Sequence, residues 1–316
     1  MIIYYAAMKI KTKRYYIYYL AIIGSSVIAI LPIKVGLFLA DIGGWFIYTF
    51  FKKYLHISVD NLISSFPDKS REEAALITKR VFTNMCRNAI EWISIYKLNK
   101  KNVDKWITIE GLDKVDRALS KGKGMLMLAS HFGNWELISI YFRLKDYPGA
   151  VIARRIYFNK YDKFITRLRG SKTVDVIYRD ESPKKMLKVL KNNGIMGILA
   201  DQDMDSVEGI FVDFFGKPTY TAKAPVALAL ASGAALMPCF IVRENAHHRL
   251  IIEDPIELTV TEDKEETIKI NTQKWSKVIE SYIRKYPDQW VWFHKRWKTK
   301  PGLTNRVTTD KATSNK

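Results

Sequence analysis

One histidine stands where a buried strand is expected to end, with a carboxylate close by in the sequence. Residues 124–130 form an apolar run of strand length, His131 follows it directly, and Glu136 comes five residues later. A histidine titrates near neutral pH and serves well as a general base, especially when a carboxylate orients its ring. We therefore predict that His131 removes a proton and that Glu136 orients it. We also expect a helix to begin near His131, which would bring unpaired N–H groups to the same place.

The chemical interpretation of His131 has a purely structural alternative. In that alternative, His131 only caps a helix and Glu136 is a solvated acid in its first turn. The sequence lacks a GxSxG elbow, an HExxH motif and a P-loop. These absences disfavour serine hydrolases of the elbow type, HExxH zinc enzymes and P-loop nucleotide-binding enzymes. Because no enzyme nucleophile is evident, His131 is better interpreted as activating a hydroxyl group of the substrate for direct transfer. We expect no metal and no cofactor.

The composition indicates an anionic partner. The chain of 316 residues carries a formal net charge of +19. A cation excess of this size favours nucleic acid, an anionic membrane surface or an acidic protein. The two cysteines, Cys86 and Cys239, lie far apart without CxxC spacing, which suggests a reducing compartment.

The N-terminal segment has the pattern of a membrane helix. Several cations precede residues 15–33, a run of 19 residues without a charge that begins with a cluster of tyrosines. Such a run is long enough to span a bilayer as a helix, and tyrosine rings collect at the headgroup level. The preceding cations favour a cytoplasmic N-terminus. A buried core helix and a cleaved signal segment remain as alternatives.

The remaining sequence predicts an α/β fold. Short apolar runs alternate with helical patterns, which is typical of a mostly parallel central sheet flanked by helices. We predict a membrane anchor or interfacial helix in residues 1–35, a single catalytic domain in residues 36–301, and a polar, disordered tail in residues 302–316.

At this point the motifs resemble a known family. The segment "SHFGNWEL" resembles the H-x4-D/E motif of the lysophospholipid acyltransferase superfamily. More narrowly, the chain is similar to bacterial lipid A acyltransferases, which add lauroyl or myristoyl chains. The further segments that carry the resemblance, in order, are "VDNLISSFPDKS", Asn84 and Glu91, "ADQD", "VDFFGKPTYTAKAPVALALASGAALMPCF" and "YPDQWVWFHKRWKTKP". The likeness extends over roughly residues 15 to 301.

The resemblance implies a glycerolipid acyltransferase-like fold and a defined reaction. An acyl chain on acyl carrier protein passes to a hydroxyl group of a membrane glycolipid such as a lipid A precursor. His131 would take the hydroxyl proton, oriented by Glu136, and hydrogen-bond donors must meet the oxyanion that forms. The candidate donors are the backbone N–H groups near Phe132 and Gly133, and the arginines Arg154, Arg155, Arg167 and Arg169.

Further residues are candidates for binding the substrate. Asp201 and Gln202 follow an apolar run of strand length, where acids and amides bind sugar hydroxyls or cap a loop. Lys217 and Lys223 suit a phosphorylated lipid headgroup. The C-terminal "WVWFHKRWKTK" interleaves aromatic rings with cations, as at a membrane interface or on nucleic acid. The N-terminal apolar run favours the membrane, and hence the bacterial inner membrane with the catalytic domain on its cytoplasmic face.

Two alternatives to lipid A acylation stay open. The same chemistry could act on another acceptor, namely a phosphatidylinositol mannoside, an ornithine lipid or a lysophospholipid. A basic nucleic-acid-binding protein is the more distant alternative, and the sequence shows none of the usual domain signatures of that class.

Overall fold

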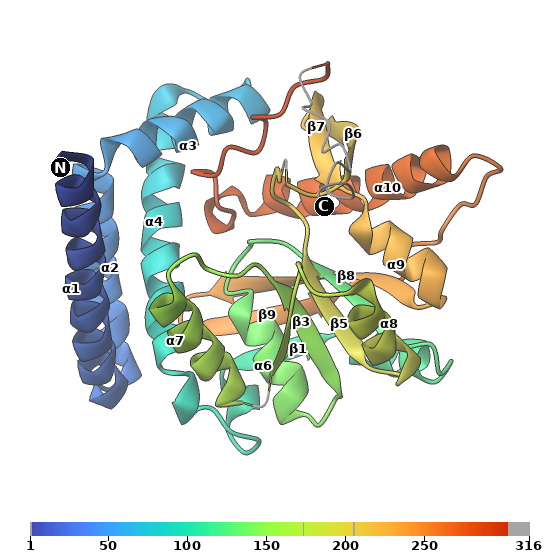
Figure 1. Ribbon diagram of the computed structural model, residues 1–316, viewed down its shortest axis with the longest axis horizontal. Coiled ribbons are helices and arrows are strands. Elements are labelled where there is room, and N and C mark those ends of the chain that lie inside the picture. The colour runs from blue at the N-terminus through green and yellow to red at the C-terminus, as the bar shows by residue number, and fades with distance from the viewer. Residues whose placement is uncertain (1, 173, 205, 303–316) are drawn as a thin grey trace, which may run out of the picture.

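A seven-stranded sheet forms the centre of the protein, in the strand order β1-β9-β8-β2-β5-β3-β4 (Figure 1). The computed structural model describes residues 2–172, 174–204 and 206–302, and it describes residues 2–13 only as helix. The strands of this sheet are β1 (Ile107–Glu110), β2 (Met125–Ala129), β3 (Gly149–Ala153), β4 (Asp175–Tyr178), β5 (Ile195–Leu199), β8 (Ala235–Glu244) and β9 (His247–Ile252).

The sheet is mostly parallel, as the sequence predicts. Strand β2 lies between β5 and β8 and runs parallel to both. Only β9 reverses direction against β8, and β1 then runs parallel to β9. Every residue of β2 is buried, which explains why this strand reads as an unbroken apolar run. Its register sets Ala129 opposite Leu199, so the segments that follow β2 and β5 leave the sheet side by side.

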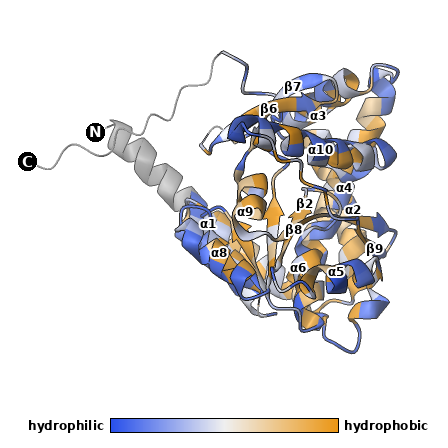
Figure 2. Ribbon diagram, turned by 90° about the vertical axis from the view of Figure 1, so that its right-hand side faces the viewer, coloured by the Kyte–Doolittle hydropathy of each residue, from blue (hydrophilic) through white to orange (hydrophobic). Residues whose placement is uncertain are grey.

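Helices cover both faces of the sheet and make three layers. Leu126 and Leu128 of β2 belong to one core cluster with α8 (Pro183–Lys191), α9 (Ala224–Ser232) and α10 (Lys264–Lys285). Met125, Met127 and Ala129 belong to a second cluster with α5 (Leu112–Leu119) and α6 (Glu136–Leu144). In Figure 2 the central strands between these layers are largely coloured as hydrophobic. The carboxyl ends of the central strands are thus held rigidly from both sides.

Four helices precede the first strand, at the left in Figure 1: α1 (Ile2–Ile30), α2 (Ile33–Phe50), α3 (Lys52–Ser65) and α4 (Arg71–Ile93). The expected apolar run of residues 15–33 is divided, since α1 ends at Ile30 and α2 begins after Pro32. Among the described residues, α2 is the helix long and apolar enough to cross a membrane. The predicted domain boundary after residue 35 falls inside α2.

Helix α2 packs on α4 through a stripe of small residues. Gly36, Ala40 and Gly44 are the buried residues of α2, spaced by one helical turn. A Cβ atom at Gly44 would lie 2.6 Å from the Cα of Thr83, so the two backbones touch. Beside this stripe, Asp41 accepts two hydrogen bonds from Arg87 of α4, at 2.6 and 2.8 Å.

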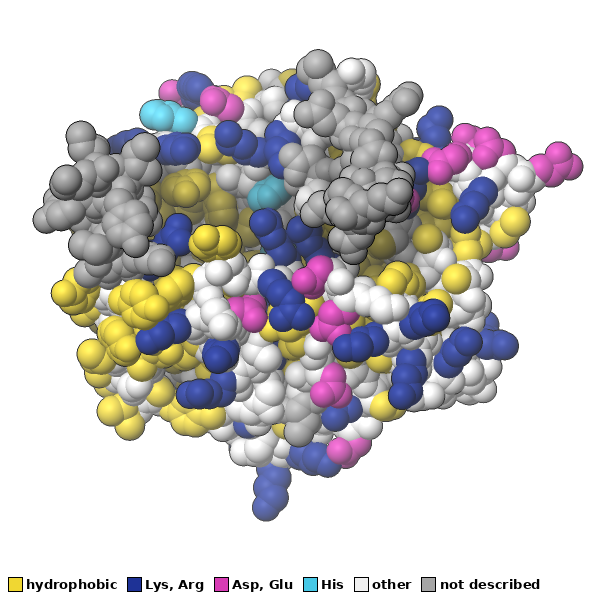
Figure 3. Space-filling model, in the orientation of Figure 1, with side chains coloured by type: hydrophobic (Ala, Val, Ile, Leu, Met, Phe, Trp, Pro, Cys, Tyr) yellow, Lys and Arg dark blue, Asp and Glu magenta, His cyan; other side chains and the backbone are white. Residues whose placement is uncertain are grey.

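The opposite side of α2 is apolar and exposed. Its large exposed side chains are Val35, Phe38, Leu39, Ile42, Trp45, Phe46 and Phe50. In Figure 3, apolar side chains gather on the side of the molecule that α1 and α2 form. An exposed apolar surface of this kind marks an interaction site, because isolated soluble proteins rarely expose one.

The remaining elements complete the fold. Helix α4 begins with a capping box, in which Ser70 Oγ accepts from the Glu73 N–H and Glu73 accepts from the Ser70 N–H. Strands β6 (Gly209–Phe214) and β7 (Lys217–Ala222) form a separate β-hairpin. Helix α7 (Asn159–Gly170) follows β3 in the chain. Of the predicted tail, residues 302–316, all but residue 302 lie outside the described residues.

The α2–α4 contact leads to a stability prediction. In an open helix position, Gly→Ala stabilises by about 1 kcal/mol. At Gly44, however, the added methyl meets the α4 backbone, and overpacking costs about 1–3 kcal/mol. We expect Gly44→Ala to lower the thermal unfolding midpoint of the detergent-solubilised protein by a few degrees. Gly24→Ala in α1 is the matched control, because no atom lies within 4 Å of its Cβ position. An equal drop for both variants would contradict close packing at Gly44.

Candidate active site

The side chain beside the His131 ring is Asp201. Each of the two residues stands two positions after its strand, β2 or β5, and these strands are parallel neighbours. His131 Nδ1 lies 2.8 Å from Asp201 Oδ1, and the His131 backbone N–H donates to Asp201 Oδ2 at 2.9 Å. The carboxylate therefore holds both the ring and the main chain of the histidine, at the sheet edge where α/β proteins bind ligands.

Asp201 is fully buried and is still an ionised acid. Its third hydrogen bond comes from Trp290 Nε1, at 2.8 Å from Oδ2. Burial by itself would raise the pKa of Asp201, but the charge and hydrogen bond of His131, with the Trp290 bond, outweigh it and lower the pKa to about 2. At neutral pH the carboxylate fixes the histidine ring in one orientation and stabilises an imidazolium.

The other nitrogen of the ring is left for a substrate. The His131 side chain is 20% exposed, and its Nε2 makes no hydrogen bond to the described part of the chain. The edge-to-face contact of the His131 ring with Trp135, centroids 5.0 Å apart, fixes the ring from one side. In Figure 3 a histidine is visible in the hollow of the face shown, with Lys and Arg side chains beside it. This arrangement suits a general base whose target approaches from solvent.

The prediction that Glu136 contacts and orients His131 is not met by the geometry. Helix α6 begins at Glu136, so residues 131–135 form a loop instead of the expected first helical turn. Glu136 is bound by Arg169 of α7, with Nε at 2.9 Å and Nη2 at 2.5 Å from its carboxylate oxygens. The side chains of Arg169 and Glu136 are only 17% and 15% exposed, respectively. The carboxylate that contacts His131 follows the neighbouring strand, and the carboxylate of the motif contacts Arg169 instead.

An apolar cavity lies next to this ion pair. It runs between α6 and the strands β2, β3 and β5, and its walls are overwhelmingly apolar. Trp135, Glu136 and Arg169 line it together with Ala129, the last residue of β2. Gly197 lies opposite Met127 in the β2–β5 register and lines the cavity, and a Cβ atom there would lie 3.2 Å from Cγ1 of Val151, another lining residue. The cavity is suited to a hydrocarbon chain whose reactive end lies toward the carboxyl ends of the strands.

The expected oxyanion donors of the loop are already engaged. Gly133 has a φ of 56°, and a Cβ there would lie 1.7 Å from the carbonyl oxygen of Ile241, so only glycine fits. Its N–H donates to the carbonyl of Gln289 at 2.9 Å, and the Phe132 N–H donates to Ser130 at 2.7 Å. Gly133 therefore permits a close approach of the loop to β8, and its N–H is used within the fold.

The four candidate arginines occupy different environments. Arg169 binds Glu136 at the cavity. Arg155 binds Asp180 and stacks on the Tyr178 ring, 3.8 Å from its centroid. Arg154 and Arg167 are exposed, and their side chains form no hydrogen bond or ion pair with the described residues. Of the four, Arg169 is therefore the one that the fold brings to the cavity, together with Glu136 and Trp135.

The other predicted binding residues are spread more widely. Gln202 follows Asp201 and is half-buried. Lys217 donates to Ser64 and lies over the Trp297 ring, and burial lowers its pKa. Lys223 binds Glu265 at the start of α10. Both lysines border the β6–β7 hairpin and are held by the fold. Among the described residues, no group of three His, Cys, Asp or Glu side chains is placed to hold a metal ion.

Two residues of the site were missed as site residues by the sequence reasoning, although both lie in the quoted C-terminal motif. Trp290 is buried and donates to Asp201. His294 has a buried Nδ1 without a hydrogen-bond partner; burial lowers its pKa, while the charge of Asp201 opposes that effect. The signal was the aromatic and cationic density of the motif, which was interpreted as a membrane surface.

Comparison with known proteins places this geometry in context. The sequence profile of the bacterial lipid A biosynthesis acyltransferase family matches residues 6–299. The lipid A biosynthesis palmitoleoyltransferase of Escherichia coli (strain K12) is 27% identical over 275 residues, 86% of this chain and 87% of that protein. The lipid A biosynthesis lauroyltransferase of the same strain is 27% identical over 265 residues, which are 81% of this chain and 83% of that protein. A phosphatidylinositol mannoside acyltransferase of Mycobacterium tuberculosis (strain CDC 1551 / Oshkosh) is 30% identical over 156 residues, 46% and 49% of the two chains.

The match to the family extends over almost the whole chain and includes both strands whose ends carry His131 and Asp201. The chain therefore belongs to the bacterial lipid A biosynthesis acyltransferase family.

Proposed function

We propose that this acyltransferase moves a fatty acyl chain from acyl carrier protein to a hydroxyl group of a membrane glycolipid, a lipid A precursor. His131 is the general base and Asp201 its orienting carboxylate. The observation that carries the proposal is a histidine whose Nδ1 is bound to a buried carboxylate, while its Nε2 has no hydrogen-bond partner among the described residues. Its ring contacts Trp135, which lines an apolar cavity. Glu136 belongs to the site through its ion pair with Arg169 at that cavity.

The reaction then proceeds by direct transfer. His131 Nε2 takes the proton of the acceptor hydroxyl as its oxygen attacks the thioester carbonyl carbon. The tetrahedral intermediate collapses, the C–S bond breaks, and the imidazolium returns its proton to the leaving thiolate. The products are an ester and a free thiol, so no group on the enzyme is consumed. Asp201 stabilises the imidazolium that exists between the two proton transfers.

The oxyanion of the intermediate needs a donor, and we assign this role to Arg169. Its guanidinium lines the cavity and is held by Glu136, with five N–H donors of which the ion pair uses two. Burial would lower the pKa of Arg169, but the Glu136 carboxylate outweighs it and raises that pKa, so the cation persists. Glu136 thus acts on the reaction by keeping Arg169 in place.

The donor and acceptor classes have separate support. Acyl carrier protein is acidic, and the net charge of +19 is complementary to it. The names of the similar proteins specify lipid A and phosphatidylinositol mannosides, both glycolipids with phosphate groups. Because the mannoside enzyme is also similar, the same chemistry on a phosphatidylinositol mannoside is the second candidate. The exposed cations Arg154 and Arg167 are available for acceptor phosphates.

The site of action is proposed to be the cytoplasmic face of the inner membrane. The exposed apolar side of α2 is the surface that meets the lipid, together with α1. Tyr15 and Tyr18 of α1 pack on Phe158 at the start of α7, so α1 lies against the catalytic domain. This arrangement keeps the His131 site within reach of a lipid acceptor.

The first prediction about the site distinguishes the role of Asp201 from that of Glu136. Asp201→Asn keeps the size of the side chain but removes the charge that orients His131, and we expect the rate of acyl transfer to fall by about two to four orders of magnitude. His131→Ala should cause a similar loss. Transfer is measured with purified protein in detergent, labelled acyl carrier protein, and a panel of lipid A precursor, phosphatidylinositol mannoside and lysophospholipid acceptors.

Glu136→Gln is the matched control in this assay. It weakens the ion pair with Arg169 and leaves the His131–Asp201 contact intact, so we expect a smaller loss than for Asp201→Asn. A larger loss for Glu136→Gln would restore the original interpretation of Glu136 as the orienting group. Transfer to a mannoside but not to the lipid A precursor would support the second candidate.

The second prediction concerns the apolar cavity. A leucine at Gly197 projects toward Val151, whose Cγ1 lies 3.2 Å from the Cβ position, and fills part of the cavity. We expect Gly197→Leu to shift the preference toward shorter acyl chains, by about tenfold in the ratio of kcat/KM for a short donor to that for a long one. The wild-type chain-length profile is the internal reference. A uniform loss at all chain lengths would argue against this cavity as the acyl site.

The third prediction concerns the membrane surface. Replacing Phe38, Ile42 and Trp45 of α2 by glutamate removes apolar side chains that are 65%, 48% and 53% exposed. We expect the triple variant to be released from membranes by a high-salt wash in larger amount than the wild type. Val260→Glu, at a loop residue that is 72% exposed, is the control and should leave recovery unchanged. Equal recovery of all three proteins in the membrane pellet would show that α2 does not hold the protein there.

A further inference from the structure

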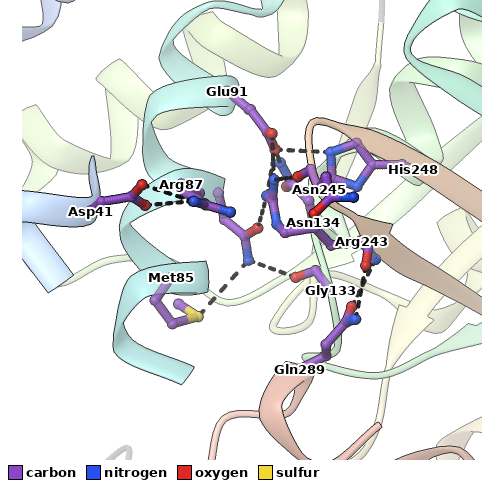
Figure 4. A network of polar contacts seen from close by, with 11 residues as sticks. Asp41, Met85, Arg87, Glu91, Gly133, Asn134, Arg243, Asn245, His248 and Gln289 are labelled. Carbon is purple, nitrogen blue, oxygen red and sulfur yellow. Dashed lines mark hydrogen bonds and ion pairs between the residues drawn. The ribbon is translucent and has the colours of Figure 1, made fainter. Parts of the chain in front are cut away.

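A buried ion pair lies behind the loop that carries His131 (Figure 4). Glu91 of α4 accepts from both terminal nitrogens of Arg243 in β8, each at 2.6 Å. Their side chains are 1% and 3% exposed. Burial would raise the pKa of Glu91, but His248 and Arg243 outweigh it and lower the pKa to about 2, so the pair is ionised.

Such a pair is a poor device for stability alone. The cost of removing two charges from water is often larger than their attraction, and apolar side chains of equal volume commonly do as well. An apolar interior borders the pair along the chain, since Ile95 and Leu98, which follow Glu91, are fully buried. The residues that the Glu91–Arg243 pair contacts indicate another role.

The pair holds the loop through two asparagines. Asn134, which is 1% exposed, donates to Glu91 Oε2 at 2.7 Å. Asn88 donates to the carbonyl of Gly133 at 2.6 Å, and its own oxygen accepts from Arg243 at 2.6 Å. We call Asn88, Glu91, Asn134 and Arg243 the loop clamp. The two residues of the loop that it fixes, 133 and 134, come just after His131 in the chain.

A second arm of the clamp reaches the carboxylate that orients His131. The main chain of Arg243 exchanges two hydrogen bonds with the Gln289 side chain, at 2.7 and 3.0 Å. The Gln289 carbonyl accepts from the Gly133 N–H, and the adjacent residue, Trp290, donates to Asp201. Arg243 is thus linked to His131 through the loop and to Asp201 through Gln289 and Trp290, and it contacts neither His131 nor Asp201 directly.

We propose that the loop clamp is a positioning device for His131, in which the Glu91–Arg243 pair fixes residues 133 and 134 so that the imidazole meets Asp201 and the acceptor hydroxyl correctly. The proposal builds on His131 as the general base. The loop is neither helix nor strand, so its own backbone bonds do not define its path. General-base catalysis requires placement to about 0.5 Å, and an error of about 1 Å can cost a hundredfold in rate.

Two residues allow the positioning role to be separated from stability. Asn134 and His248 donate to the same oxygen, Glu91 Oε2, at 2.7 and 3.0 Å, and both are buried. His248 comes from β9, and its side chain forms no hydrogen bond with the loop: Nε2 is bound to Glu91, and Nδ1 has no hydrogen-bond partner among the described residues. Replacing either residue by an apolar one of similar size therefore removes one hydrogen bond from the same carboxylate, and both leave the ion pair in place.

The experiment compares Asn134→Leu with His248→Phe in the full-length protein. Thermal unfolding and steady-state acyl transfer are measured for each variant. We expect similar drops in the unfolding midpoint. Asn134→Leu should lower kcat by tens- to a hundredfold with KM for the acyl donor within about twofold, whereas His248→Phe should keep kcat within about threefold of wild type. If Asn134→Leu does not fold, Asn134→Ala replaces it in the same comparison.

A double-variant cycle completes the test. Because the clamp acts through His131, Asn134→Leu should cost nothing further in a His131→Ala background. Equal effects of Asn134→Leu and His248→Phe on kcat, or a full additional loss in the His131→Ala background, would overturn the positioning role. A His131→Ala protein with the wild-type rate would instead overturn the proposed function, because the base would then lie elsewhere. The two failures are thus distinguishable.

Discussion

The buried carboxylate of Asp201 is the constraint on which the site depends. A fully buried charge must have its hydrogen-bonding capacity satisfied, and Asp201 obtains this from the ring and backbone of His131 and from Trp290. The acceptor and its donors come from three distant parts of the sequence. The adjacent, parallel strands β2 and β5 bring His131 and Asp201 together, and the C-terminal segment pairs with the loop after β2 and supplies Trp290. Loss of any one donor would leave part of the hydrogen-bonding capacity of this buried carboxylate unsatisfied.

This constraint explains which parts of the site the sequence could predict. The apolar run of β2, the histidine at its end and the acid at the end of β5 are local patterns, so His131 and Asp201 were both identified as candidates. Their contact depends on the strand order, which local patterns do not encode. Glu136 was chosen as the partner because it is near in sequence. The loop from His131 to Trp135, however, follows a path that the close approach of Gly133 to Ile241 dictates, and α6 starts too late to turn Glu136 toward His131.

The N-terminal helices show the same division between local pattern and tertiary contact. Counting uncharged residues identifies residues 15–33 as one apolar run and takes no account of packing between helices. In the structure Asp41 lies on the side of α2 that faces α4, where Arg87 binds it, and Pro32 separates the two helices. The spacing of Gly36, Ala40 and Gly44 was the available signal for a packed face. Only the opposite face of α2 is apolar and exposed, so the helix combines a protein-facing side with a side suited to lipid.

Helix α4 links these two regions. Thr83 and Arg87 meet α2, while Asn88 and Glu91, about one turn further along, hold the loop next to His131. A single helix therefore links the apolar surface of α2 to the loop that carries His131. In the proposed reaction, with a soluble donor and a lipid acceptor, the distance between them determines how far the acceptor hydroxyl must rise from the bilayer to reach His131. The buried charge of Glu91 is consistent with that requirement, because a clamp with directional hydrogen bonds preserves the position of the loop better than apolar contacts do.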